Sequence, residues 1–435
     1  MYVHDLTDAQ NGTTQAGPEQ RERPARSAFG RGSAIPLLPD EARGREELPG
    51  AKTTGGRRVV GHSLHEMASS TQIKSRAREE IDSLTALRGI AALWVVLYHY
   101  RFHSAGFPLD WLWRDGHLAV DVFFVLSGFI MIHVYGEAFR TGRFDYKAFM
   151  MRRFSRIYPV HLVTTLVIAG LYLVSGSASL SQGTGDQLDS LWVNLLMLQA
   201  WNLTASLYLN YPSWSISAEV FAYIFFPAFA TIVFMVRRSL VAPLAIIFLV
   251  AWCFAYNLLH GFPLLGSQLF DLTTNFSILR ILPEFLLGAA FAVIIKGSVW
   301  PAMPVILVTV ALQAIALHFG LAIAFVALVP VLIGSLYNLR MGMPRWLVYL
   351  GRISYSLYMV HAVVEKLIFG AAKSVFHVAE GHFPAWSIPF TVILAIGAAA
   401  LTYHFVEKPG RRYLMGIEPA RRRVQQVSKG PSPFI

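Results

Sequence analysis

The stretch LAVDVFFVLSGFIMIHVY, residues 118–135, contains one acidic residue, Asp121, in a largely apolar run. A helix of about 20 apolar residues crosses the ~30 Å hydrocarbon core of a bilayer. The stretch therefore predicts a membrane-spanning helix, and similar runs recur on both sides of it. The composition agrees, because 54% of the 435 residues are apolar and only 14% are charged, against about 25% charged in a soluble protein.

From residue 81 onward the apolar runs predict about ten spans. Their approximate ranges are 85–103, 118–135, 156–175, 214–236, 240–259, 278–296, 301–318, 320–337, 347–370 and 386–406. The stretch 190–203 is too short to cross and is expected to lie in the membrane interface. The predicted fold class is an all-α polytopic membrane protein.

The two ends of the chain differ from the apolar centre. Residues 1–80 are rich in Gly, Pro, Ser, Arg and Glu, which predicts a disordered cytoplasmic extension, either regulatory or dispensable. We expect a transmembrane domain at 81–413 and a basic cytoplasmic tail at 414–435. The single cysteine, Cys253, rules out an intrachain disulfide and a multi-cysteine zinc site, and we expect no bound metal.

Lys and Arg are distributed unevenly between the predicted loops. If the N-terminus is cytoplasmic, the inner loops and adjoining span ends carry twelve of them and the outer side carries four. The outer four are Arg101, Arg114, Lys366 and Lys373. This positive-inside asymmetry predicts a multi-pass protein of the inner (cytoplasmic) membrane with both termini cytoplasmic. The net charge of +11 is explained by the basic loops that orient the protein in the membrane. We therefore expect no nucleic-acid partner.

Ionisable side chains at membrane depth are costly and usually functional. The predicted topology places Arg88, Arg153 and Arg156 near the cytoplasmic face. It gathers a second cluster near the outer face, made of His99, Asp121, Glu219, Arg280, Glu284 and His361.

Arg88 and His99 are predicted to project from the same face of one helix. They are eleven residues apart, which at roughly 100° per residue is three turns plus about 20°, with a rise of roughly 16 Å. One stripe would therefore join the two clusters. His99 suits a general base, or it caps a helix at the interface. Arg153 and Arg156 suit a di-anionic ligand, or they are ordinary positive-inside anchors.

Six blocks of this sequence resemble, in the same order, the signatures of the membrane acyltransferase-3 family. They are LTALRG at 84–89 followed by Tyr98 and His99, VDVFFVLSGF at 120–129, RFSR at 153–156, SWSISAE at 213–219, ISYSLYMVH at 353–361, and EKP at 407–409 followed by Arg411 and Arg412. The family often has a second Glu after the position of Glu219, where this chain has Val220. The SGNH-type hydrolase domain that is fused to some members is expected to be absent.

The resemblance implies an O-acyltransferase that uses cytosolic acyl-CoA as its donor substrate. Acetyl-CoA is the expected donor, with succinyl or longer acyl groups as competitors. The acceptor would be a hydroxyl of an extracytoplasmic or lipid-linked sugar, such as an exopolysaccharide or a lipopolysaccharide, with polysaccharide-assembly proteins as possible partners beside the lipid bilayer. Arg153 and Arg156 would hold the donor phosphates, and Arg88 would help to seat the nucleotide or the pantetheine arm.

In this scheme His99 takes the proton of the attacking hydroxyl, and Glu219 or Asp121 holds the resulting imidazolium. An acyl-histidine intermediate is a variant. Ser215, Ser217 and Tyr223 are the candidate donors to the oxyanion, and nothing in the sequence selects among them. Two other classes of function stay open. One is a transporter of an acylated or anionic substrate, and the other is a non-catalytic acyl-CoA-binding membrane sensor.

Overall fold

The computed structural model describes the chain from residue 82 to residue 416, with short gaps. The described ranges are 82–104, 107–108, 110–174, 190–203, 209–260, 268–273, 277–296, 298, 300–339, 341–379 and 381–416. All of them belong to one compact unit. The extension predicted at 1–80 and nearly all of the tail predicted at 414–435 lie outside the described residues.

The described residues form helices and, apart from one isolated bridge between Ser104 and His382, no β-structure. The first helix occupies 82–100. The following elements are η1 (Arg101–His103), α3 (Asp110–Trp113), η2 (Gly116–Leu118), α4 (Ala119–Arg140), α5 (Tyr146–Val174), α7 (Leu191–Leu195), α8 (Ser213–Ile224) and α9 (Phe226–Met235). The remainder are α10 (Arg238–Leu259), η3 (Gln268–Asp271), α11 (Ile278–Ile295), α12 (Ala302–His318), α13 (Ala322–Asn338), α14 (Arg345–Arg352), α15 (Ser354–Phe376), α16 (Ser387–Thr402) and the π-helical turn η4 (Tyr403–Glu407).

This architecture confirms an all-α polytopic membrane protein. Among the described residues, five helices are long and apolar enough to cross a membrane, or seven if the bent pairs α8–α9 and α14–α15 each count as one span. The helices α12 and α13 are apolar but shorter. Together with the helix at 82–100, these elements coincide with all ten predicted spans. The stretch 190–203 contains only the short helix α7, flanked by turns.

The helices depart from the predicted spans at one start and at two bends, among other small shifts of their ends. α5 begins at Tyr146, ten residues before the predicted start, because Lys and Arg end an apolar run without ending a helix. α8 and α9 meet at a 59° bend, where Pro227 removes a backbone donor. α14 and α15 meet at a 67° bend at Ile353.

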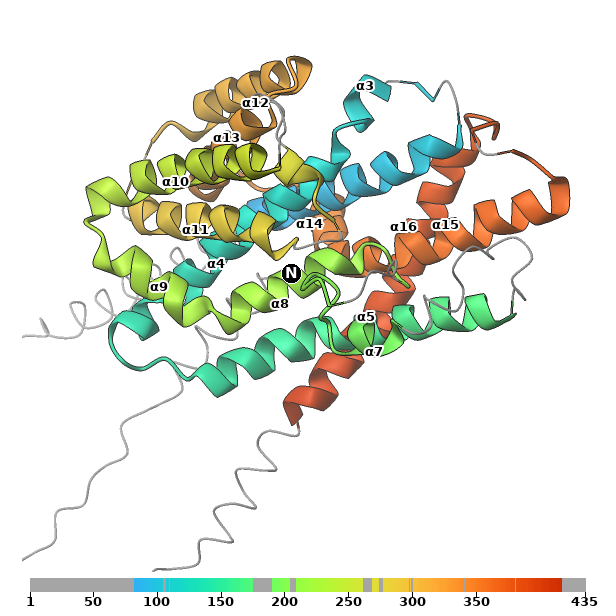
Figure 1. Cartoon of the computed structure of the whole chain (residues 1–435), viewed down its shortest axis with the longest axis horizontal. Helices are drawn as coiled ribbons and strands as arrows, with labels where there is room; N and C mark the ends of the chain where they lie inside the picture. The colour runs from blue at the N-terminus through green and yellow to red at the C-terminus, as the bar shows by residue number, and fades with distance from the viewer. Residues whose placement is uncertain are drawn as a thin grey trace, which may run out of the picture. The chain divides into compact units, whose positions relative to one another are not determined.

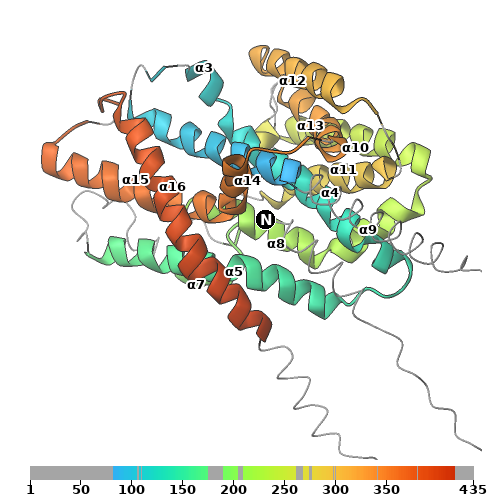
Figure 2. The same cartoon turned by 180° about the vertical axis from the view of Figure 1, so that it is seen from behind.

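The helices gather into two groups around α4 (Figures 1 and 2). The helices α10 to α13 lie together on one side of α4, and α5, α15 and α16 lie on the other side, with the helix at 82–100 between them. α4 and α11 cross closely at two glycines. A Cβ at Gly128 would lie 2.0 Å from the carbonyl oxygen of Phe285, and one at Gly288 would lie 1.9 Å from that of Val125.

A second close crossing positions the start of α15. A Cβ at Gly351 would lie 1.8 Å from the carbonyl oxygen of Thr85, so only glycine lets α14 lie directly against the helix at 82–100. Since α15 begins three residues later, its first turn is brought beside Arg88, where Arg88 Nη2 donates to Ser354 Oγ at 2.9 Å.

The helix at 82–100, α5 and α15 run in the same direction. Arg88 contacts Ser354 near the start of α15, and Tyr100 donates to the His361 carbonyl two turns further along. Between α5 and α15, Tyr355 bonds to the Ile157 carbonyl and Lys366 bonds to Tyr172. This parallel packing agrees with the prediction that the three helices are the first, third and ninth spans.

Candidate active site

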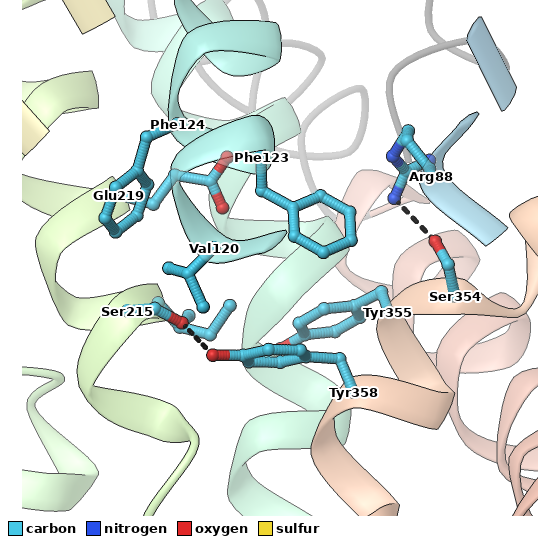
Figure 3. A pocket seen from close by; sticks show the side chains of 10 residues that line it. Arg88, Val120, Phe123, Phe124, Ser215, Glu219, Ser354, Tyr355 and Tyr358 are labelled. Atoms are coloured by element: carbon cyan, nitrogen blue, oxygen red, sulfur yellow. Dashed lines mark hydrogen bonds between the residues drawn. The ribbon is translucent and has the colours of Figure 1, made fainter. Parts of the chain in front are cut away.

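A pocket lies between the helix at 82–100, α4, α8 and α15 (Figure 3), with about 440 Å³ of empty space when its opening to solvent is included. Its wall is largely apolar and aromatic, with a few polar groups at its ends. Its lining residues are Arg88, Val120, Phe123, Phe124, Ser215, Ile216, Glu219, Ser354, Tyr355 and Tyr358. An apolar cavity with a few convergent polar groups is the usual form of a small-molecule site.

One end of the pocket carries Arg88, whose guanidinium is 2% exposed and bonds to Ser354 in the first turn of α15. Arg88 interacts electrostatically with Arg156 and Glu407. Arg156 Nη2 lies 3.5 Å from Glu407 Oε1, and Ser356 Oγ donates to Glu407 Oε2 at 2.6 Å. Two arginines and a helix N-terminus here attract negative charge, and a carboxylate of the chain itself already occupies part of this region.

Glu407 is a site residue that sequence reasoning quoted in a block but assigned no role. It ends the π-helical turn η4, and its side chain is buried. A π-turn widens a helix by one residue and is frequent at functional sites. The wider turn cannot be read from the apolar pattern, which is why the burial of this carboxylate beside two arginines was not anticipated.

Arg153 is buried as predicted but has a different partner from Arg156. Its Nη2 donates to Tyr135 of α4 at 3.1 Å, and its guanidinium lies 5.6 Å from the centre of that ring. It also interacts electrostatically with Tyr223. The three arginines that were predicted to bind the donor therefore form two groups. Arg88 lies with Arg156, whereas Arg153 lies toward α4 and α8.

His99, which is partly exposed, lies at the other end of the helix face that carries Arg88. Its ring centre lies 5.2 Å from that of His361 on α15 and 4.7 Å from that of Tyr211. Since Arg88 and His99 both contact α15, the prediction that they share one helix face is confirmed. His361, which is fully buried, lies 5.9 Å from the ring of Tyr358. A row of rings thus leads from the pocket wall to His99.

The hydrogen bond of His99 fixes its tautomer. Nδ1 lies 2.9 Å from the carbonyl oxygen of Val95, one turn earlier in the same helix. A carbonyl oxygen only accepts hydrogen bonds, so Nδ1 carries the proton and Nε2 keeps the lone pair that a general base needs. The Val95 carbonyl orients this ring, whereas Glu219 and Asp121, which were predicted to hold the imidazolium, bond to Ser127 and Arg280.

Asp121 forms an ion pair with Arg280 away from His99. Arg280 donates to both carboxylate oxygens, at 2.8 and 2.6 Å, and both side chains are almost completely buried. Glu284, also fully buried, interacts with Asp121. The guanidinium of Arg280 lies 5.2 Å from the centre of the Trp214 ring. The predicted outer cluster therefore separates, because Asp121, Arg280 and Glu284 form a group of their own between α4 and α11.

Glu219 faces the pocket rather than His99. Its Oε1 accepts a hydrogen bond from Ser127 at 2.9 Å, and it interacts with Tyr223 on the next turn of α8. Tyr223 is 1% exposed. These contacts place Glu219 on the α4 side of the pocket, where it contributes a polar group to a largely apolar wall, whereas Tyr223 is not one of the lining residues.

The two serine candidates have different surroundings. Ser215 Oγ lies 2.6 Å from Tyr358 Oη, at the end of the pocket opposite Arg88. Ser217 instead donates to the Met197 carbonyl at 2.7 Å and accepts from the Ala200 amide at 3.1 Å. The hydroxyl of Ser217 therefore fastens the segment 190–203 to α8, and it does not line the pocket as Ser215 does.

Sequence reasoning missed three residues beside His99. Glu365 Oε1 lies 2.8 Å from His103 Nε2, and Tyr211 Oη donates to Glu365 Oε2 at 2.5 Å. Glu365 also interacts electrostatically with His99. The signal that could have found it is its spacing, because Glu365 follows His361 by four residues and lies on the same helix face.

Within the described residues, no group of three or more His, Cys, Asp and Glu side chains could hold a metal ion. The chemistry available is that of a largely apolar pocket with a buried arginine at one end, joined by aromatic rings to a histidine. A polytopic all-α protein with this arrangement can bind an anionic ligand at one end and take a proton at the other.

The comparison with known proteins identifies the class. A family model described as an acyltransferase domain matches residues 81–404, so the chain belongs to the membrane acyltransferase-3 family and is an acyltransferase. The chain is 30% identical over 394 residues to acyltransferase MdmB of Streptomyces mycarofaciens, covering 81% of this chain and 95% of that protein. No solved structure matches the chain.

Two further relatives carry additional sequence. The chain is 25% identical over 392 residues to putative peptidoglycan O-acetyltransferase YrhL of Bacillus subtilis (strain 168), covering 81% of this chain and 58% of that protein. It is 23% identical over 372 residues to putative O-acetyltransferase SACOL0978 of Staphylococcus aureus (strain COL), covering 78% of this chain and 58% of that one.

Proposed function

We propose that this acyltransferase moves an acyl group, in the first instance acetyl, from cytosolic acyl-CoA to a sugar hydroxyl on the opposite side of the membrane. The observation that carries the proposal is the single stripe along α15. Arg88 lies at its start on Ser354, His99 lies on His361 two turns further along, and the pocket opens beside Arg88.

The donor would bind at the Arg88 end. Arg88 and Arg156 carry guanidinium forks suited to phosphate, and the N-terminus of α15 adds its partial positive charge. The lining of Phe123, Phe124 and Ile216 suits the carbon skeleton of a pantetheine arm, while Glu219 and Ser215 can bond to its amide groups. Arg153 would interact with the donor from the α4 side.

The acceptor hydroxyl would lose its proton to His99 Nε2 while its oxygen attacks the thioester carbonyl. The carbon–sulfur bond then breaks, an ester forms, and the thiolate takes the proton back from His99. The products are the acylated sugar and free CoA. Ser215 and Tyr358, which are hydrogen-bonded to each other beside the row of rings, are the hydroxyls placed to donate to the oxyanion.

The names of the relatives support a saccharide acceptor, since one of them is a putative peptidoglycan O-acetyltransferase. An exopolysaccharide, a lipopolysaccharide or a lipid-linked glycan would present the same kind of hydroxyl. The charge asymmetry of the loops supports a cytoplasmic position for the Arg156 end and for both termini, and hence an extracytoplasmic position for His99.

The proposal is tested by following labelled acetyl groups. Membranes that contain the wild-type chain or His99→Ala are incubated with acetyl-CoA carrying a radiolabelled acetyl group, and alkali-labile label in envelope glycan is measured. The wild type is expected to transfer label and His99→Ala to lose at least about 100-fold, the usual contribution of a general base. Equal transfer by both would remove His99 from the base role.

A further inference from the structure

Two helices that run in parallel present matching pairs of ionisable residues next to the row of rings. The chain from 82 to 103 carries His99 and His103, and α15 carries His361 and Glu365 at the same spacing of four residues. His99 contacts His361, with 5.2 Å between their ring centres, and His103 Nε2 lies within hydrogen-bond distance of Glu365 Oε1, at 2.8 Å. These are two successive contacts between the same two elements, one helical turn apart.

Tyr211 connects the His99–His361 contact to the His103–Glu365 contact. Its ring centre lies 4.7 Å from that of His99 and 5.6 Å from that of His361, and its hydroxyl donates to Glu365 Oε2 at 2.5 Å. The position of Tyr211 is fixed by the preceding residue. Asn210 is fully buried and donates to Thr164 on α5 and to the Met359 carbonyl on α15.

Glu365 is the carboxylate that faces this end of the stripe. Asp121 is engaged by Arg280, and Glu219 is bonded to Ser127 at the pocket. Both oxygens of Glu365 have partners, and its electrostatic interaction with His99 favours a positive charge on that ring. Its side chain is partly buried, at 18% exposure, between His103 and Tyr211.

We propose that Glu365, acting through Tyr211 and through its charge, is the positioning residue that holds His99 in place and stabilises the imidazolium formed during acyl transfer. This inference rests on the proposed role of His99 as the base. The Val95 carbonyl sets the tautomer of His99 by accepting from Nδ1. Glu365 supplies the negative charge that a carbonyl lacks, and Tyr211 keeps the ring of His99 from rotating.

The effect on rate is set by charge and distance. Loss of a carboxylate bonded directly to a catalytic histidine lowers kcat by roughly 10⁴-fold. Glu365 reaches His99 through Tyr211, so its neutralisation should cost less. We expect a loss of about ten-fold or more, because a charge a few ångströms further away in a partly buried site still contributes to the free energy of the imidazolium.

The test compares four variants of the full-length protein in membranes, with acetyl-CoA as the donor and the endogenous envelope glycan as the acceptor. Glu365→Gln keeps the size and an oxygen to accept from Tyr211 but removes the charge. Tyr211→Phe keeps the ring and removes the bridge. The matched control is Tyr100→Phe, which removes a buried bond between the same two elements, from Tyr100 Oη to the His361 carbonyl at 2.9 Å. His99→Ala reports on the base itself.

Glu365→Gln is expected to lower kcat by about ten-fold or more with less than a two-fold change in the KM of acetyl-CoA. Tyr211→Phe should lower kcat by a smaller factor, and Tyr100→Phe should keep the wild-type kcat. The proposal is overturned if Glu365→Gln keeps the wild-type kcat. It is also overturned if Tyr100→Phe loses as much kcat as Glu365→Gln, because both losses would then come from disturbed helix packing. An active His99→Ala would refute the base role, whereas an inactive His99→Ala beside a fully active Glu365→Gln refutes this inference alone.

Discussion

At the scale of single residues, Arg88 and Arg156, which lie beside the start of α15, differ from ordinary membrane anchors. Anchoring Lys and Arg side chains extend into water at the membrane surface, as the exposed Arg140 does. Arg88 and Arg156 are instead almost fully buried, with Ser354 and Glu407 as their partners. Buried guanidinium groups require a reason beyond orientation in the bilayer, and the proposed binding of the donor phosphates would provide one.

Replacement of Arg88 by Lys tests this role. Arg88→Lys keeps the positive charge but loses the fork that pairs with phosphate and Ser354. We expect the KM of acetyl-CoA to rise by about 10- to 100-fold, as for the loss of one charged hydrogen bond of roughly 1.5–3 kcal/mol. Steady-state kinetics with Arg140→Lys as the control measures it, and an unchanged KM in Arg88→Lys would contradict a donor site at this position.

Asp121 is expected to stabilise the fold rather than to take part in the reaction. Its carboxylate is paired with Arg280 at both oxygens. Removal of one partner of a buried ion pair costs about 3–5 kcal/mol, whereas replacement of both by apolar residues is often neutral. Asp121→Leu should therefore unfold more readily in detergent than Asp121→Leu with Arg280→Met. Recovery of acyl transfer in the double variant would confirm the structural role, and recovered stability without activity would make Asp121 functional.

At the scale of helices, the glycine crossings determine which side chains meet. The contact of α4 with α11 leaves no space for a Cβ at Gly128 or Gly288, and this close approach brings Asp121 to Arg280. Small residues at such contacts drive helix association within a bilayer. The same reasoning applies to Gly351, which lets α14 approach Thr85 and so brings α15 to Arg88.

Alanine substitution should lower stability at the glycines of a helix crossing but not at glycines with open space around them. Gly288→Ala should lower the melting temperature of the detergent-solubilised protein, because the new methyl group would meet the Val125 carbonyl. Gly397→Ala on α16 is the matched control, since nothing lies within 4 Å of its Cβ position, and there alanine should be neutral or stabilising by about 0.5–1 kcal/mol. Equal melting temperatures for the two variants would show that the crossing tolerates a shift.

The sequence predicted the helices better than their contacts, for a physical reason. A bilayer core demands an apolar run of fixed length, so helices could be located at all ten predicted ranges from hydropathy. The repeat of about 3.6 residues per turn fixes which residues share a helix face, which is why the shared face of Arg88 and His99 was predicted correctly. Which helices touch is decided by glycine crossings and bends. Hydropathy does not reveal these, so Asp121 was grouped with His99 and Glu365 was missed.

At the scale of the whole molecule, the proposed transfer needs two ends of the helix bundle with different roles. The helix at 82–100, α5 and α15 run in parallel, so Arg88, Arg156 and the start of α15 lie at one end and His99, His103 and Glu365 at the other. Donor and acceptor would approach from opposite sides of the membrane and meet near the row of rings between the pocket and His99.

The most direct test of this claim is a measurement of sidedness in sealed membrane vesicles that contain the protein and its native envelope glycan. Radiolabelled acetyl-CoA, which does not cross the bilayer, is added outside either inverted or right-side-out vesicles, and alkali-labile label in the enclosed or outward-facing glycan is counted. We predict rapid labelling in intact inverted vesicles, none in intact right-side-out vesicles, and none with His99→Ala in either. Equal labelling of intact right-side-out vesicles would contradict transfer across the membrane.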